Sequence, residues 1–260
     1  MPDIGVTFPW AAATLWPPWL AVLFAPAIGS LLGVFIERLP AGRSVVLGRS
    51  ACVGCGRPLT PFELVPILSY LRLRGRCRCG AAAIGPFHLA IEIAAIAIPL
   101  SALLAGQTGA MLWVGSVLGW GLLALAWTDA ESLTLPDALT LPLIPAGLLA
   151  TLWLLPEALA AHAAAAMLGY AAFTLLRLAW RAWRGVEAMG AADAKLMAVA
   201  GAWLGPAALP DVVLAAGLSG MVLAGALRLA GQAVGRQTRL PFGPPLALAI
   251  WGAWLLLGLG

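Results

Sequence analysis

Apolar stretches of about 20 residues recur along the whole chain, and they restrict it to a membrane environment. Hydrophobic residues make up 62% of the chain and charged residues 10%, whereas charged residues are about 25% of a typical soluble domain. No alternating strand pattern is present, and a helix satisfies its own backbone hydrogen bonds in lipid. The sequence therefore predicts an all-α polytopic membrane protein.

Short polar interruptions divide the apolar sequence into eight predicted transmembrane helices. They cover residues 16–36, 85–105, 108–127, 138–155, 158–180, 195–209, 212–230 and 241–259. The sixth is short, so we expect a partial or tilted helix there. The first is predicted to be an anchor, because no basic region precedes it and no small-residue cleavage site is obvious after it.

The positions of Lys and Arg predict the orientation of these helices. All 15 basic residues lie at the junctions between spans one and two, five and six, and seven and eight. With eight spans these junctions share one side, which the positive-inside rule makes the cytoplasm, and both termini lie opposite. The opposite connections carry Asp3, Glu157 and Asp211 but no basic residue. Topology and anionic lipid thus explain the positive charge, and no nucleic-acid partner is needed.

All four cysteines lie in the only sizeable polar segment, between the first two spans. Cys52 and Cys55 form a C-x-x-C pair, and Cys77 and Cys79 form a C-x-C pair. In a reducing cytoplasm two such tight turns favour a four-thiolate structural zinc site over disulfides, with unliganded or redox-active thiols as the alternative. A segment this small has little apolar surface to bury, so a metal would help it fold.

Acidic residues gather at the predicted cytoplasmic ends of several spans. The segment "WTDAESLTLPDALTLPL" contains Asp129, Glu131 and Asp137, and the segment "RGVEAMGAADAKLM" contains Glu187 and Asp193. Structural interpretations exist for most of them. Asp137 and Asp193 each precede or open an apolar run and are candidates for helix caps, and Glu187 is a candidate partner for a nearby arginine, Arg184.

A functional interpretation pairs Asp129 with Asp193. An aspartyl protease needs two neighbouring carboxylates, one ionised to activate water and one protonated to polarise the peptide carbonyl and then protonate the leaving amine. Small residues before Asp193, including Gly190 and Ala192, would let backbone and substrate approach closely. These features predict a catalytic pair at the cytoplasmic face.

The chain resembles the bacterial prepilin peptidases, also called type IV leader peptidases, from about residue 25 onward. Five segments carry the resemblance: "GSLLGVFIERLP", "RSACVGCGRPLTPFELVPILSYLRLRGRCRCG", "TDAESLTLPDALTLPL", "EAMGAADAKLMAVAGAWLG" and "LPFGPPLALA". The resemblance implies that Asp129 and Asp193 are the catalytic aspartates. Two positions depart from the family pattern: Ala192 replaces the second glycine of Gly-x-Gly-Asp, and the second cysteine pair is C-x-C.

The resemblance also implies a function. Such enzymes of the bacterial inner membrane remove basic leaders from type IV prepilins or pilin-like secretion (pseudopilin) subunits on the cytoplasmic side. Many then N-methylate the new amino terminus with S-adenosylmethionine. The expected parts are a first transmembrane helix (1–36), a cytoplasmic Cys-rich domain (37–84) and a transmembrane aspartyl protease domain (85–260).

Two alternatives to this bifunctional enzyme stay open at the level of sequence. One is a peptidase without methyltransferase activity, since no Gly-rich nucleotide motif is visible. The other is a non-enzymatic transporter or assembly scaffold, in which the acidic residues are caps or an ion path. The sequence does not distinguish pilus assembly from type II secretion or define an oligomeric state.

Overall fold

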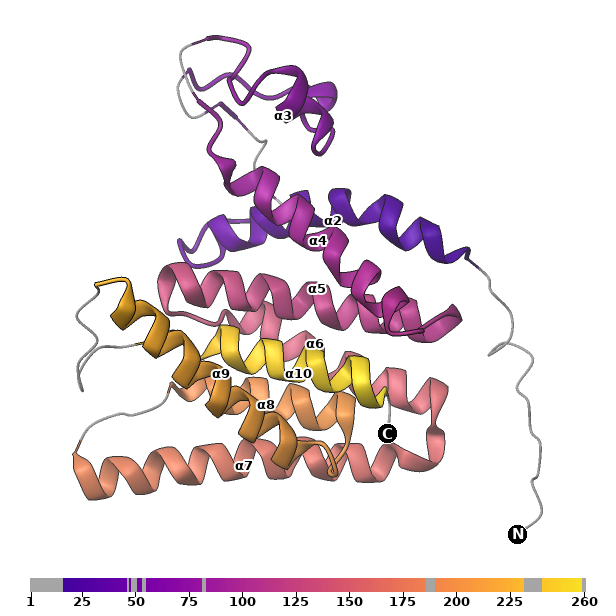
Figure 1. Ribbon diagram of the computed structural model, residues 1–260, viewed down its shortest axis with the longest axis vertical. Coiled ribbons are helices and arrows are strands. Elements are labelled where there is room, and N and C mark those ends of the chain that lie inside the picture. Colours follow the sequence, from indigo (N-terminus) through magenta and orange to yellow (C-terminus); the bar gives the residue numbers. More distant parts are fainter. Residues whose placement is uncertain are drawn as a thin grey trace. The chain divides into compact units, whose positions relative to one another are not determined.

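The computed structural model describes residues 16–45, 47, 51–52, 55–80, 83–185, 190–231 and 240–258. Helices dominate these residues, and the only β-pairings among them are two isolated bridges. The chain forms two compact units, residues 1–120 and 121–260, which are described separately below. The predicted all-α architecture is confirmed (Figure 1).

Eight long helices correspond one to one with the eight predicted spans. They are α2 (Pro18–Arg38), α4 (Pro86–Leu104), α5 (Gly109–Ser132), α6 (Asp137–Leu154), α7 (Leu159–Arg184), α8 (Ala191–Leu204), α9 (Leu209–Leu229) and α10 (Gly243–Leu257). Shorter elements are η1 (Pro61–Glu63), α3 (Leu68–Arg72) and η2 (Pro156–Ala158). Among the described residues, six helices are long and apolar enough to cross a bilayer: α2, α4, α5, α6, α7 with η2, and α9. The chain is a multi-pass membrane protein.

In the first unit, α2 and α4 lie against each other with their backbones in close approach (Figure 1). A Cβ atom added at Gly29 of α2 would lie 2.7 Å from the Cα atom of Glu92 in α4. The absence of a side chain at Gly29 therefore permits this packing distance. The ring N–H of Trp120 donates to the carbonyl of Ala95 over 2.9 Å and links α5 to α4.

In the second unit, α8 packs against α6, α7, α9 and α10. Every residue of α8 from Asp193 to Leu204 is buried except Lys195. Other helices of the protein cover α8. Its apolar side chains are therefore core residues, although its 14 residues are fewer than the roughly 20 that a membrane span needs. The predicted short sixth span is thus the most enclosed helix of its unit.

Small residues bring α7 and α8 into close contact. A Cβ atom at Gly201 would lie 2.4 Å from the carbonyl of Ala165, and one at Gly169 would lie 2.7 Å from the carbonyl oxygen of Met197. Such close helix approach through Gly and Ala is typical of membrane proteins. The alanine-rich and glycine-rich sequence of α7 therefore serves the packing around α8.

Buried polar contacts fix α6, α7 and α8 to one another. Nδ1 of His162 lies 3.1 Å from the carbonyl oxygen of Ala202 and 3.2 Å from the hydroxyl of Thr151. The ring N–H of Trp203 donates to the carbonyl of Leu143 over 2.7 Å. A buried donor without a partner is costly, so these bonds oppose sliding of α8 along its neighbours.

Candidate functional site

Asp129 lies near the C-terminal end of α5 and is buried, with 6% of its surface exposed. Its Oδ2 atom accepts a hydrogen bond from the backbone N–H of Gly243 over 2.7 Å. Gly243 begins α10, where Pro244 and Pro245 occupy the next two positions. An N–H in the first turn of a helix has no partner within that helix, and the Asp129 carboxylate supplies one.

Asp193 is the third residue of α8 and is equally buried, at 6% exposure. Its Oδ2 atom accepts the backbone N–H of Gly190, the N-cap residue of α8, over 3.0 Å. The predicted capping role of Asp193 is therefore confirmed by this hydrogen bond. The bond uses only one of the two carboxylate oxygens, Oδ2.

The two carboxylates are close enough for their charges to interact. Both are presented in the same way, with Oδ2 held by a backbone N–H at a helix N-terminus. Among the residues that the structure describes, neither Oδ1 atom has a hydrogen-bond partner. Asp129 and Asp193, which lie far apart in the sequence, thus come near each other from α5 and α8, each with one carboxylate oxygen held by a backbone N–H.

Gly243 was not assigned a role from sequence, and the structure places it against Asp129. A Cβ atom at Gly243 would lie 2.7 Å from Oδ2 and 2.8 Å from Cβ of Asp129. Only glycine leaves room for the carboxylate here. The available signal was the motif "LPFGPPLALA", whose Gly-Pro-Pro run is typical of a helix start.

Asp137 does not cap α6, contrary to the prediction. Pro136 is the N-cap residue and Asp137 the first helical residue, and no side chain caps this end. Asp137 instead forms an ion pair with Lys195 of α8. A lysine on a neighbouring helix, not the local sequence, decides the contact of Asp137.

The remaining motif residues have local roles or lie outside the described part. Glu131 is exposed, and its carboxylate accepts a hydrogen bond from the ring N–H of Trp127 over 2.8 Å. Glu187, proposed as a partner of Arg184, lies outside the described residues. Ala192, which replaces a glycine of the family pattern, is an ordinary residue in the first turn of α8, and its φ is not positive. This position does not require glycine for its backbone conformation.

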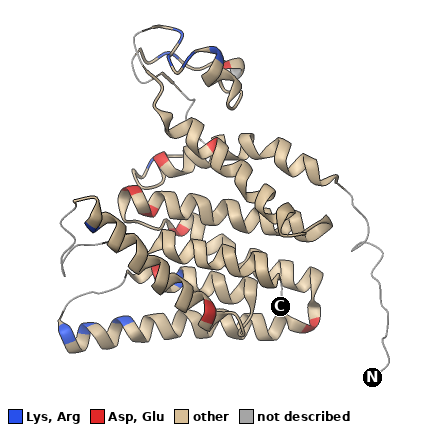
Figure 2. Ribbon diagram, viewed as in Figure 1, with Lys and Arg blue, Asp and Glu red and all other residues tan. Residues whose placement is uncertain are grey.

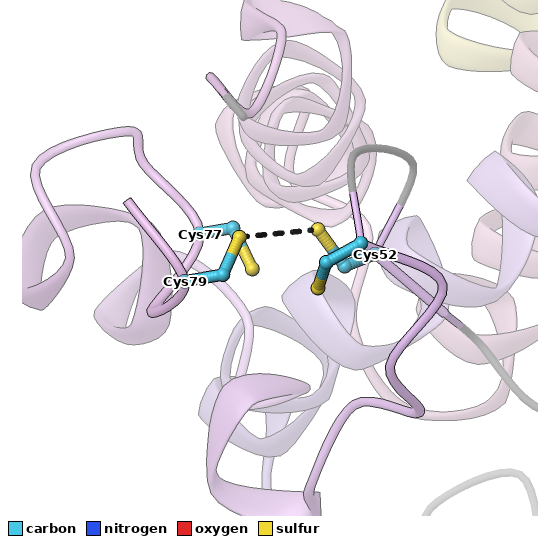
Figure 3. A group of neighbouring side chains, drawn as sticks. Cys52, Cys77 and Cys79 are labelled. Carbon is cyan, nitrogen blue, oxygen red and sulfur yellow. Dashed lines mark hydrogen bonds between the residues drawn. The ribbon is translucent and has the colours of Figure 1, made fainter. Parts of the chain in front are cut away.

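The four cysteines come together in the first unit, as Figure 3 shows for Cys52, Cys77 and Cys79. All four Sγ atoms lie within 4.8 Å of one another, and those of Cys52 and Cys79 are 3.8 Å apart. A tetrahedral zinc–thiolate centre with bonds of about 2.3 Å places its sulfurs about 3.8 Å apart. The donor set and its spacing therefore fit a metal ion, although the second pair is only C-x-C.

An ion pair next to the cysteines stabilises the Cys-rich insert. The Arg57 guanidinium donates to Oε1 of Glu63 over 2.6 Å, and Oε2 accepts the N–H and hydroxyl of Thr60. The Arg57 side chain and these Thr60 bonds lower the pKa of Glu63 to about 2. The carboxylate is thus ionised at all physiological pH values.

Glu92 is a second residue that the sequence prediction missed. It is a buried carboxylate within α4, and it accepts the backbone N–H of Ile67 over 2.7 Å. Ile67 has φ of 60° and ψ of −52°, and Leu68 donates to the carbonyl of Pro66 across it, which makes a strained γ-turn. The signal for Glu92 was an acidic residue inside a predicted span.

Comparison with known proteins gives these sites a family context. A model described as "Bacterial Peptidase A24 N-terminal domain" matches residues 23–105, which include the cysteine cluster and Glu92. A model described as "Type IV leader peptidase family" matches residues 116–225, which include both aspartates.

Curated relatives match most of the chain. A Burkholderia pseudomallei (strain 1026b) protein is 41% identical over 215 residues, which are 81% of this chain and 68% of the relative. A Pseudomonas aeruginosa protein is 35% identical over 267 residues, 90% of this chain and 88% of the relative. An Aeromonas hydrophila protein is 35% identical over 269 residues, 92% of this chain and 91% of the relative. All three are named prepilin leader peptidase/N-methyltransferase.

The chain belongs to the type IV leader peptidase family. Membership makes it an enzyme, a peptidase, and decides against the transporter or scaffold that the sequence had left open. No solved structure matches the fold.

Proposed function

We propose that the chain cleaves the basic leader peptide from type IV prepilins or pilin-like secretion proteins, with Asp129 and Asp193 as its catalytic pair. One observation carries the proposal: two buried carboxylates from α5 and α8 lie close together, each with one oxygen fixed by a backbone N–H. The names of the curated relatives supply the substrate class.

The geometry suits general acid–base hydrolysis. Two neighbouring buried carboxylates do not both ionise readily, so the pair holds one proton between its members. The ionised member takes a proton from the attacking water, and the protonated member donates its proton to the leaving amine. The N–H groups of Gly190 and Gly243 hold both carboxylates in orientation through their Oδ2 atoms.

Methyl transfer to the new amino terminus is the second part of the proposal. The relatives' names include N-methyltransferase, and S-adenosylmethionine is the methyl donor implied. The amine nitrogen forms a bond to the methyl carbon while the bond between that carbon and sulfur breaks. The electron pair of the broken bond stays on sulfur, and the methylated amine loses a proton to solvent. The competing possibility is a peptidase that leaves the new terminus unmethylated.

We place the catalytic pair at the cytoplasmic face of the bacterial inner membrane. Basic residues gather at the C-terminal end of α7, the end that leads to α8 and Asp193 (Figure 2). The positive-inside rule makes this side cytoplasmic, where the basic leader of a prepilin would remain. The proposed parts are the first helix (1–36), the Cys-rich domain (37–84) and the protease domain (85–260).

The cysteine cluster is proposed to bind a structural zinc ion through the thiolates of all four residues: Cys52, Cys55, Cys77 and Cys79. Bound zinc would hold the two cysteine turns together and supply folding energy to a segment with little core. We expect about one zinc per chain by elemental analysis of protein purified without added metal, and loss of zinc in a Cys52→Ser, Cys77→Ser variant. A metal-free parent protein that still folds would contradict this assignment.

The function is tested with the purified chain in lipid nanodiscs and a prepilin that carries its leader. Mass spectrometry should show loss of the leader, and addition of one methyl group only when S-adenosylmethionine is present. Cleavage without methylation would support the peptidase activity and contradict the methyltransferase activity. An uncleaved substrate would contradict the proposal as a whole.

A further inference from the structure

The C-terminal turns of α7 carry basic side chains that have no part in the chemistry proposed above (Figure 2). Helix α7 has 26 residues, whereas about 20 residues span the apolar part of a bilayer. Its last turns therefore extend into the headgroup layer. Arg177, Arg181 and Arg184 follow one another at intervals of four and three residues, which places them on one side of the helix.

Two tryptophan rings hold the Arg184 side chain. The guanidinium carbon of Arg184 lies 4.4 Å from the ring centroid of Trp183 and 5.5 Å from that of Trp180. These two rings meet edge to face, with their centroids 5.8 Å apart. Both rings precede Arg184 in the helix, so its guanidinium lies back along α7 toward the apolar turns. Tryptophan favours the boundary between lipid tails and water, so the three side chains fix a positive charge at the depth of the headgroups.

Arg177 adds a hydrogen-bond donor without an acceptor. Its Nε–H group is buried, and among the residues that the structure describes this group has no hydrogen-bond partner. Arg177 as a whole is partly exposed, so the group lies near the surface of α7 rather than in the core of the unit. A donor left unpaired in this way is costly, and an acceptor supplied from outside the chain would remove that cost.

The charge and the apolar surroundings of these arginines select the kind of acceptor. No carboxylate in the described part of the chain pairs with Arg177 or Arg184, so this surface favours an anion. Guanidinium groups bind phosphate oxygens through paired N–H donors. Leu176 and Leu178, on either side of Arg177 in the sequence, are 53% and 48% exposed and can contact acyl chains. A phosphate joined to acyl chains satisfies both parts of the surface, whereas free phosphate satisfies only the first.

We propose that the C-terminal turns of α7 bind one anionic phospholipid, with its phosphate on Arg177 and Arg184 and its acyl chains against Leu176 and Leu178. The general attraction of basic segments to anionic lipid is spread over many residues. This site is a discrete one, because an unpaired donor and a guanidinium held by two rings share one side of α7. The proposal rests on the membrane placement of α7 and not on the peptidase or methyltransferase activity.

Native mass spectrometry tests the proposal by measuring how much phosphatidylglycerol or phosphatidylcholine, of equal chain length, binds to the full chain after delipidation in detergent. The parent is compared with an Arg177→Gln, Arg184→Gln double variant and with an Arg72→Gln, Arg228→Gln control. The control removes the same charge, here from the last turns of α3 and α9. We expect the parent to prefer phosphatidylglycerol, the α7 variant to bind it at least about tenfold more weakly, and the control to bind like the parent.

Several results would overturn the proposal. They are unaltered phosphatidylglycerol binding in the α7 double variant, an equal loss in both double variants, which would indicate general electrostatics, and equal affinity of the parent for the two lipids. A melting temperature measured on each variant separates lost binding from lost folding. If the α7 double variant does not fold, the single Arg184→Gln variant replaces it, because that side chain is exposed. Weaker phosphatidylglycerol binding by the single variant would support the site, and unaltered binding would refute it.

Discussion

At the scale of single residues, two backbone N–H groups decide how the aspartates are presented. Gly243 and Gly190 each hold one carboxylate oxygen, at 2.7 Å and 3.0 Å. The sequence identified Asp129 and Asp193 through their motifs, but it could not reveal the contact of Asp129 with a residue 114 positions away. Such contacts depend on how helices pack, which no local pattern encodes.

Replacing Gly243 with alanine should disable cleavage. The added methyl group would overlap the Asp129 carboxylate and push it from its position, and a displacement of about 1 Å costs roughly 100-fold in rate. The measurement is the cleavage rate of a prepilin substrate. Gly252→Ala in the same helix is the matched control, because nothing lies within 4 Å of its added Cβ. Equal rates in the two variants would contradict the positioning role.

Restoring the family glycine at Ala192 should preserve cleavage and lower stability slightly. Ala192 has helical geometry in the first turn of α8, and Gly within a helix costs about 0.5–1 kcal/mol relative to Ala. Thermal unfolding of Ala192→Gly should therefore show a small fall in melting temperature. A large gain in cleavage rate would show instead that the Ala192 methyl group obstructs the site.

At the scale of elements, hydropathy predicted the helices well and their ends less well. All eight spans appear as helices, because lipid-facing and buried helices both require apolar sequence. The cap predicted at Asp137 was wrong, since Pro136 is the N-cap residue and the Asp137 carboxylate pairs with Lys195 of another helix. Helix α7 extends to Arg184, four residues beyond the predicted span, and Arg181 and Arg184 in its last turn suit the negative end of a helix.

The ion pair of the Cys-rich insert should give stability that depends on pH. The pKa of Glu63 is lowered from 4.5 to about 2, so its bonds stabilise the folded state above about pH 4.5 and are lost as pH falls toward 2. The melting temperature of the parent should exceed that of Glu63→Gln by a constant margin from pH 5 to 7. That margin should shrink between about pH 4 and pH 2, and a margin independent of pH would contradict the role of Glu63.

At the scale of the whole molecule, the charge distribution is explained only by a particular number of spans. Placing all 15 basic residues on one side requires eight spans, and the described residues contain eight long helices, six of which are long and apolar enough to cross a bilayer. What the sequence could not supply is the set of buried polar contacts between elements. Glu92 looked like one acidic residue in an apolar helix, and its partner, the backbone of Ile67, could be found only from the folded chain.

The cleavage rate of purified Asp129→Asn and Asp193→Asn variants tests the catalytic pair most directly. Each substitution keeps the shape of the side chain but removes the acid–base function, so each should lower leader cleavage by at least about 100-fold. An Asp137→Asn variant, which loses only a partly exposed ion pair with Lys195, should cleave like the parent. Near-normal cleavage by either Asp129→Asn or Asp193→Asn, in protein that inserts and folds normally, would contradict the assignment of these aspartates.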